Sequence, residues 1–124
     1  MKSILIVDDD ATSLTLVESV LEADGYETRR AADPAEALEV MKRWTPDVIL
    51  LDIQLRGLDN GLEFARRLKA NIATRMTPII AFTAYGERWS EAETRAAGCD
   101  GFLEKPITAP MLAAAVRRAV EKSG

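Results

Sequence analysis

Short apolar segments alternate with longer amphipathic segments along the chain. Three of the apolar segments, residues 4–7, 48–51 and 79–82, show no alternation between polar and apolar positions. Strands that are buried on both faces, as in the centre of a parallel sheet, have this pattern. Two weaker segments, residues 27–31 and 101–103, bring the expected strands to five.

Helical periodicity follows each expected strand. Gly25 marks the end of the first helix, and Asp33-Pro34 provides the cap and first turn of the second. A fourth helix is expected over residues 87–97. The apolar positions that define the other helices are Leu14, Val17 and Leu21, then Ala37, Leu38 and Met41, then Leu62, Ala65 and Leu68, and finally Met111, Leu112, Ala115, Val116 and Ala119. This fivefold alternation predicts an α/β fold with a doubly wound parallel sheet.

Length and composition narrow the class of protein. The 124 residues are enough for one domain, so we expect a single domain over 1–124 with no output domain. The net charge of −4 argues against nucleic-acid binding, which usually requires a basic surface. A single cysteine, Cys99, excludes an intrachain disulfide and favours a reducing compartment. The first apolar segment is too short for a signal peptide or a membrane span, and we therefore expect a cytoplasmic protein.

Polar residues follow four of the expected strands. Residues 8–10 are three aspartates after the first strand, Asp52 follows the third, Thr83 the fourth and Lys105 the fifth. In open parallel sheets, ligands bind beyond the carboxyl ends of the strands, where these residues would meet. Each residue taken singly also fits an ordinary structural role, since aspartate and threonine often cap helices or turns and lysine is usually solvated.

The set of carboxylates needs a positive charge. Two carboxylates 4 Å apart repel by about 4 kcal/mol at an effective dielectric constant near 20. The chain has no histidine, so a metal would have to bind oxygen, which favours Mg²⁺ or Ca²⁺. The sequence lacks the twelve-residue loop of alternating ligands that is typical of calcium sites. Calcium binding as the main function is therefore not expected, and the residues alone leave open which of the two cations is bound.

Four segments in order match a known family. Residues 4–9, residues 48–52, Thr83-Ala84 and Lys105-Pro106 together resemble the receiver domains of two-component response regulators. The resemblance implies a five-stranded, flavodoxin-like (β/α)5 fold with strand order 2-1-3-4-5. The resemblance implies that Asp52 is the phosphoacceptor. It also implies that Asp8, Asp9, Asp52 and the backbone carbonyl of Gln54 are the Mg²⁺ ligands. Thr83 and Lys105 would bind the phosphoryl group, and the switch residues would be Thr83 and Phe102. The peptide bond between Lys105 and Pro106 is cis in this family.

The resemblance also implies a function. A histidine kinase or histidine phosphotransfer protein would pass a phosphoryl group to Asp52, with Mg²⁺ present. The fourth helix, fifth strand and fifth helix would then change for a downstream protein target bound in trans. No enzyme activity is expected beyond self-catalysed phosphotransfer and dephosphorylation, and no nucleic acid or membrane is expected as a partner. The protein would be a monomer or a weak dimer.

The loop after Asp52 departs from the family pattern. Arg56 replaces the usual proline, and one extra residue precedes Gly61. Two other functions stay open. In a haloacid-dehalogenase-like phosphatase, Asp8 would be the nucleophile, but that family needs an acidic motif after the lysine, and here only Glu121 follows. The second alternative is a receiver-like docking module that works without phosphorylation.

Overall fold

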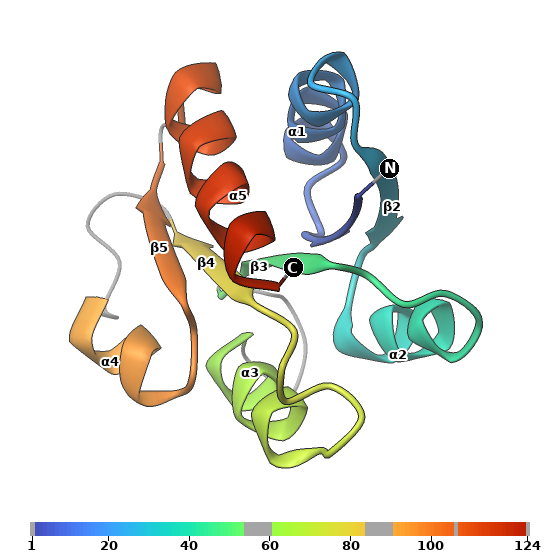
Figure 1. Cartoon of the computed structure of the whole chain (residues 1–124), viewed down its shortest axis with the longest axis vertical. Helices are drawn as coiled ribbons and strands as arrows, with labels where there is room; N and C mark the ends of the chain where they lie inside the picture. The colour runs from blue at the N-terminus through green and yellow to red at the C-terminus, as the bar shows by residue number, and fades with distance from the viewer. Residues whose placement is uncertain (1, 54–60, 84–90, 106, 124) are drawn as a thin grey trace.

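The computed structural model describes residues 2–53, 61–83, 91–105 and 107–123. In this part of the chain, strands and helices alternate in the order expected from the sequence (Figure 1). The elements are β1 (Ser3–Val7), α1 (Ala11–Ala23), β2 (Glu27–Ala31), α2 (Pro34–Arg43), β3 (Val48–Asp52), α3 (Gly61–Ala70), β4 (Ile79–Thr83), α4 (Glu91–Ala96), β5 (Gly101–Glu104) and α5 (Ala109–Ser123). None of the described helices has the length and apolar character needed to cross a membrane.

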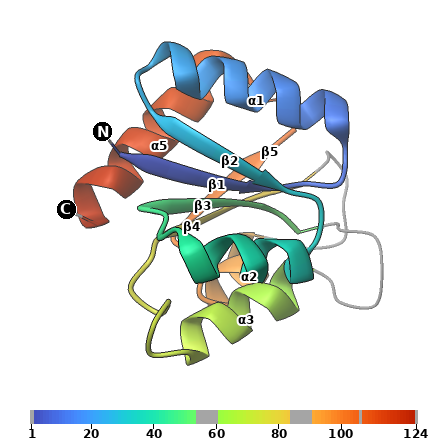
Figure 2. The same ribbon diagram turned by 90° about the vertical axis from the view of Figure 1, so that its right-hand side faces the viewer.

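The strands form one parallel sheet of five in the order β2-β1-β3-β4-β5. This confirms the predicted fold class and strand order. Figure 2 shows the sheet between two helical layers, with α1 and α5 on one face and α2 and α3 on the other. The chain changes direction across the sheet between β1 and β3, so the carboxyl ends of these two strands lie at the topological switch point, where doubly wound folds bind their ligands.

Helices on both faces explain why the central strands carry no polar alternation. Every residue of β1 and β3 is buried. The core divides into two clusters, one on each face of the sheet. The cluster under α1 and α5, called here the α1/α5 core, consists of Ile4, Ile6, Leu14, Val17, Leu21, Val48, Leu50, Ile80, Phe82, Leu112, Val116 and Ala119. The lone thiol of Cys99 is buried in the opposite cluster, and burial raises its pKa to about 11.

Capping residues set the helix ends that the sequence predicts. The side chain of Asp10 accepts a hydrogen bond from Thr12 N at 3.0 Å at the start of α1. Asp33 accepts from Glu36 N at 2.8 Å at the start of α2. Gly25, just after α1, has a φ of 89°, which side chains with a Cβ rarely adopt.

Two of the apolar positions that mark α2 and α5 in the sequence do not face the core. Leu38 and Met111 are 43% and 42% exposed. In α2 the buried stripe runs through Ala37, with Val40 and Met41 packed beside it. Leu38 lies one residue, about 100° of helical rotation, away from Ala37 and faces outward. The fourth expected helix is described only over Glu91–Ala96, since residues 84–90 lie outside the described part.

Lys69 joins three elements at the amino-terminal edge of the sheet. Its Nζ, near the end of α3, donates to Asp100 Oδ2 at 3.0 Å, to the Thr77 carbonyl at 2.9 Å and to the Arg75 carbonyl at 3.3 Å. The same Asp100 oxygen accepts from Ile79 N at 2.9 Å, at the start of β4. The ammonium therefore ties α3 to the beginnings of β4 and β5.

Replacing Lys69 with methionine is expected to lower the free energy of unfolding by about 1–3 kcal/mol, because the charged hydrogen bonds are lost and the side chain is only 20% exposed. Lys42→Met is the matched control, since the Lys42 side chain is 69% exposed and its ion pair with Glu39 is worth less than about 1 kcal/mol. Urea denaturation of both variants measures the difference. Equal stability of the two variants would show that the Lys69 contacts contribute nothing.

Candidate functional site

Three carboxylates meet at the carboxyl edge of the sheet. Asp8 follows β1 directly, and its backbone N–H donates to the Ala31 carbonyl at 3.0 Å. Asp52 is the last residue of β3. One oxygen from each of Asp8, Asp9 and Asp52 lies within 4.8 Å of the others. Asp8 and Asp52 are buried and Asp9 is half-buried, so water screens their repulsion poorly.

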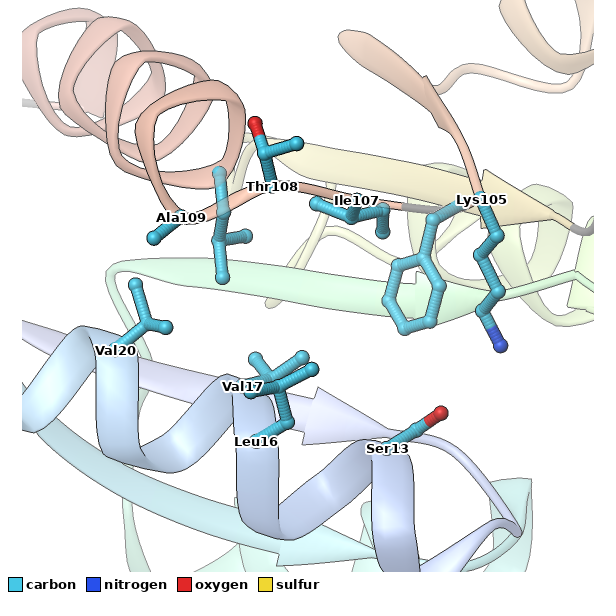
Figure 3. A pocket seen from close by; sticks show the side chains of 10 residues that line it. Ser13, Leu16, Val17, Val20, Lys105, Ile107, Thr108 and Ala109 are labelled. Atoms are coloured by element: carbon cyan, nitrogen blue, oxygen red, sulfur yellow. The ribbon is translucent and has the colours of Figure 1, made fainter.

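Lys105 brings a positive charge to two of these carboxylates. Its Nζ lies 3.4 Å from Asp52 Oδ2 and 3.7 Å from Asp8 Oδ2. The residue follows β5, and Figure 3 shows its side chain extending from the end of that strand. The ammonium carries one positive charge, which offsets part of the negative charge of Asp8 and Asp52.

The two carboxylate oxygens of Asp8 differ in the hydrogen bonds that they accept from the described residues. Asp8 Oδ1 accepts from Asp10 N at 2.9 Å, whereas the buried Oδ2 accepts from no group among the described residues. Burial, reinforced by the charge of Asp52, raises the pKa of Asp8 from 3.8 to about 6, although the Asp10 N–H and Lys105 both act to lower it. A buried carboxylate oxygen without a donor is costly unless a cation or another group occupies the space beside it.

This donor set fits Mg²⁺. Magnesium is a hard cation that binds one or two carboxylates and keeps several waters. The carboxylate oxygens of Asp8, Asp9 and Asp52 supply the required ligand type. Asp8 Oδ2 accepts no hydrogen bond from the described residues, so it keeps its capacity to bind a metal. The residues present therefore suit the expected cofactor.

The remaining predicted site residues are only partly described. Thr83 is the final residue of β4 and pairs with Glu104 of β5, but its side chain lies outside the described part. Gln54 and Pro106, and with Pro106 the predicted cis bond, also lie outside the described residues. Phe102 is half-buried in β5 and packs against the core cluster under α2 and α3. The structure thus brings together Asp8, Asp9, Asp52 and Lys105, while the predicted roles of all these residues stay predictions.

Gly61 adds a contact that the sequence analysis missed. It begins α3, and its N–H donates to the Ile53 carbonyl at 3.0 Å, just past Asp52. A Cβ at this position would lie 2.3 Å from Ile53 Cα and 2.7 Å from the Asp52 carbonyl oxygen. Only glycine allows the backbone of α3 to approach the acidic site so closely.

Gly61→Ala is expected to destabilise the fold by about 1–3 kcal/mol, because backbone atoms must move to accept the methyl group. Gly101→Ala is the comparison variant, since its added Cβ would first meet the Ile80 side chain at 3.3 Å, which can give way. Thermal unfolding of both variants checks the difference. If Gly61→Ala lowers the thermal stability no more than Gly101→Ala does, the close approach of Gly61 to the backbone of Ile53 is contradicted.

The fold and the acidic group with its lysine define a class of protein, the receiver-type α/β domains. The sequence comparison agrees, since the family model of the response regulator receiver domain matches residues 4–117. The chain is 39% identical over 109 residues to the polar-differentiation response regulator DivK of Brucella anthropi, covering 88% of each protein. The chain belongs to the response regulator receiver family, the signalling domains of two-component systems.

Solved structures give the same result. A putative response regulator from Chloroflexus aurantiacus superimposes with a TM-score of 0.91 at 33% identity, covering 97% of this chain and 98% of the other. The chemotaxis protein CheY4 of Vibrio cholerae superimposes with a TM-score of 0.87 at 30% identity, covering 96% and 98%. The resemblance drawn from the sequence is therefore confirmed for the family and the fold. Receiver domains act as signalling switches and not as classical enzymes.

Proposed function

We propose that this chain is a Mg²⁺-dependent switch that accepts a phosphoryl group on Asp52. One observation carries the proposal: the buried Asp52 carboxylate lies 3.4 Å from the Lys105 ammonium, beside an Asp8 oxygen that accepts no hydrogen bond from the described residues. Membership in the receiver family supports this assignment. The arrangement offers a nucleophile, a fixed cation and carboxylates for a metal at one edge of the sheet.

The proposed reaction transfers a phosphoryl group from a histidine nitrogen of the donor protein to a carboxylate oxygen of Asp52. An Asp52 carboxylate oxygen attacks the phosphorus of a phosphohistidine on the donor protein, and the phosphorus–nitrogen bond breaks with its electron pair returning to the imidazole. Lys105 stabilises the charge that gathers on the phosphoryl oxygens. Asp8 and Asp9, with Asp52 and the Gln54 carbonyl, would hold Mg²⁺, which supplies further charge neutralisation when it is bound. The product is an acyl phosphate with a charge close to −2.

The new charge is the proposed signal. The oxygens of the bound phosphoryl group would recruit Lys105 and the Thr83 hydroxyl. The Phe102 side chain would then change its position on the surface made by α4, β5 and α5. That surface has a groove of about 820 Å³, which Phe102, Met111 and Arg118 help to line. A protein target bound there in trans would read the change. The donor would be a histidine kinase or a histidine phosphotransfer protein, and the protein would work in the cytoplasm.

A small phosphodonor tests the function without knowledge of the partner. The protein is incubated with acetyl phosphate and Mg²⁺, and intact-mass spectrometry measures the adduct. The expected result is the mass of one added phosphoryl group, which is absent when EDTA removes the metal. If no adduct forms with metal present, the proposed function fails and the docking module that needs no phosphorylation becomes the better description.

A further inference from the structure

The ammonium of Lys105 has a third neighbour besides Asp52 and Asp8. Its Nζ lies over the aromatic ring of Phe82, 5.1 Å from the ring centroid. A cation within about 6 Å of a ring centroid is attracted to the electron-rich face of the ring. Phe82 therefore contacts the cation of the acidic site directly.

The sheet register explains how Phe82 reaches this place. Asp52 of β3 pairs with Phe82 of β4. In-register residues on neighbouring parallel strands lie about 4.8 Å apart and point to the same face of the sheet. For Phe82 that face is the α1/α5 core. Lys105, after β5, thus reaches across the Phe82 ring to the Asp52 carboxylate.

The other side of the Lys105 side chain borders open space. A groove of about 250 Å³ lies between α1 and the start of α5, and Lys105 and Phe82 both line it. Figure 3 shows Lys105 at one end, with Val17 and Leu16 of α1 across from Ile107. The Lys105 side chain is 28% exposed. A flexible four-carbon chain beside open space does not hold its ammonium in place by packing alone.

We infer that Phe82 is a positioning residue that holds the Lys105 ammonium against Asp52 through its ring face. The inference rests on the proposed function, because it gives Phe82 a part in the same phosphotransfer. The simpler view is that Phe82 is only a core side chain, since it is 1% exposed and packs in the α1/α5 core. The two views differ in whether the aromatic face itself matters.

Two substitutions separate the views. Phe82→Leu keeps an apolar side chain but removes the ring, whereas Phe82→Tyr keeps the ring at a position that lines the adjoining groove. Ile80→Val is the matched control for a change in packing, because Ile80 lies two residues earlier in β4, in the same core cluster, and is also 1% exposed.

The first test is the rate of adduct formation with acetyl phosphate. Phe82→Leu should be slower than wild type by about threefold to tenfold, whereas Phe82→Tyr and Ile80→Val should stay within about twofold. In a Lys105→Met background, Phe82→Leu should have no further effect, because the residue it positions is gone. The inference would be overturned if Phe82→Leu and Phe82→Tyr lowered the rate of adduct formation equally. It would also be overturned if Phe82→Leu lowered this rate as much in the Lys105→Met background as in wild type.

The second test needs no phosphorylation. In the metal-free protein, the ε-methylene protons of Lys105 should be shifted upfield in NMR spectra by the ring current, and the shift should vanish in Phe82→Leu and persist in Phe82→Tyr. A wild-type lysine without this shift would overturn the inference and leave the proposed function standing. A wild type that shows the shift but forms no adduct would overturn the proposed function and the positioning role that rests on it.

Discussion

Asp52→Asn should lower the rate of phosphoryl-adduct formation by about three orders of magnitude or more, because it replaces the nucleophilic carboxylate by an amide of the same shape. The amide would keep one oxygen for the Lys105 ammonium, which lies 3.4 Å from Asp52 Oδ2 in the wild type. The fold should therefore persist while the chemistry is lost. Intact-mass spectrometry with acetyl phosphate and Mg²⁺ measures the adduct.

Asp24→Asn is the matched control for this substitution. Asp24 follows α1 and is exposed, so the change removes one carboxylate without touching the acidic site. This variant should form the adduct as wild type does. An adduct of undiminished rate in Asp52→Asn would contradict the assignment of the phosphoacceptor.

Asp8→Asn should stabilise the metal-free protein at neutral pH by about 1–3 kcal/mol. Burial raises the pKa of Asp8 from 3.8 to about 6, which means that the folded protein bears the cost of an ionised buried carboxylate above that pH. Asparagine removes the charge and keeps an oxygen for the Asp10 N–H. Urea denaturation in EDTA measures the gain.

The pH dependence of this gain follows from the direction of the shift. The folded state binds the Asp8 proton more tightly than the unfolded state, so its ionisation makes the free energy of unfolding of the wild type fall as pH rises from about 4 to about 6. The difference in the free energy of unfolding between Asp8→Asn and wild type should be small below pH 4, and above pH 6 it should be larger and no longer change with pH. A constant difference across this range would contradict the account of Asp8.

Magnesium should make wild type more stable than Asp8→Asn, which is the reverse of the order expected without metal. A ligand that binds only the folded state raises its stability, and the Asp8 carboxylate is the group expected to hold the metal. Wild type should therefore gain thermal stability with Mg²⁺, while Asp8→Asn should gain much less. Equal stabilisation of the two proteins would exclude Asp8 as a metal ligand.

The strands and the polar residues that follow them were predictable from the sequence because both depend on local pattern. Uninterrupted apolar runs identified the buried strands β1, β3 and β4, and the topology then placed Asp8, Asp52 and Lys105 at one edge. Helix ends followed from capping residues such as Asp33. The sequence did not show which apolar residues of α2 face the core, because several neighbouring ones, Leu38 among them, allow more than one stripe.

Contacts between distant segments were not predictable in this way. The ring of Phe82 meets Lys105 only because β3, β4 and β5 adopt a particular register. The requirement for glycine at 61 comes from the backbone of Ile53, which is not adjacent to Gly61 in the sequence. The lack of a hydrogen bond to Asp8 Oδ2 from the described residues likewise depends on which groups surround this oxygen after folding. Such features follow from three-dimensional packing and have no local sequence signal.

The most direct test of the central claim is to locate the phosphoryl group. The protein is treated with acetyl phosphate and Mg²⁺, the acyl phosphate is reduced with borohydride, and peptide mass spectrometry finds the aspartate that has become homoserine. The account predicts reduction at Asp52. Reduction at Asp8 would contradict the account and point instead to a phosphatase of the haloacid-dehalogenase type, with Asp8 as its nucleophile.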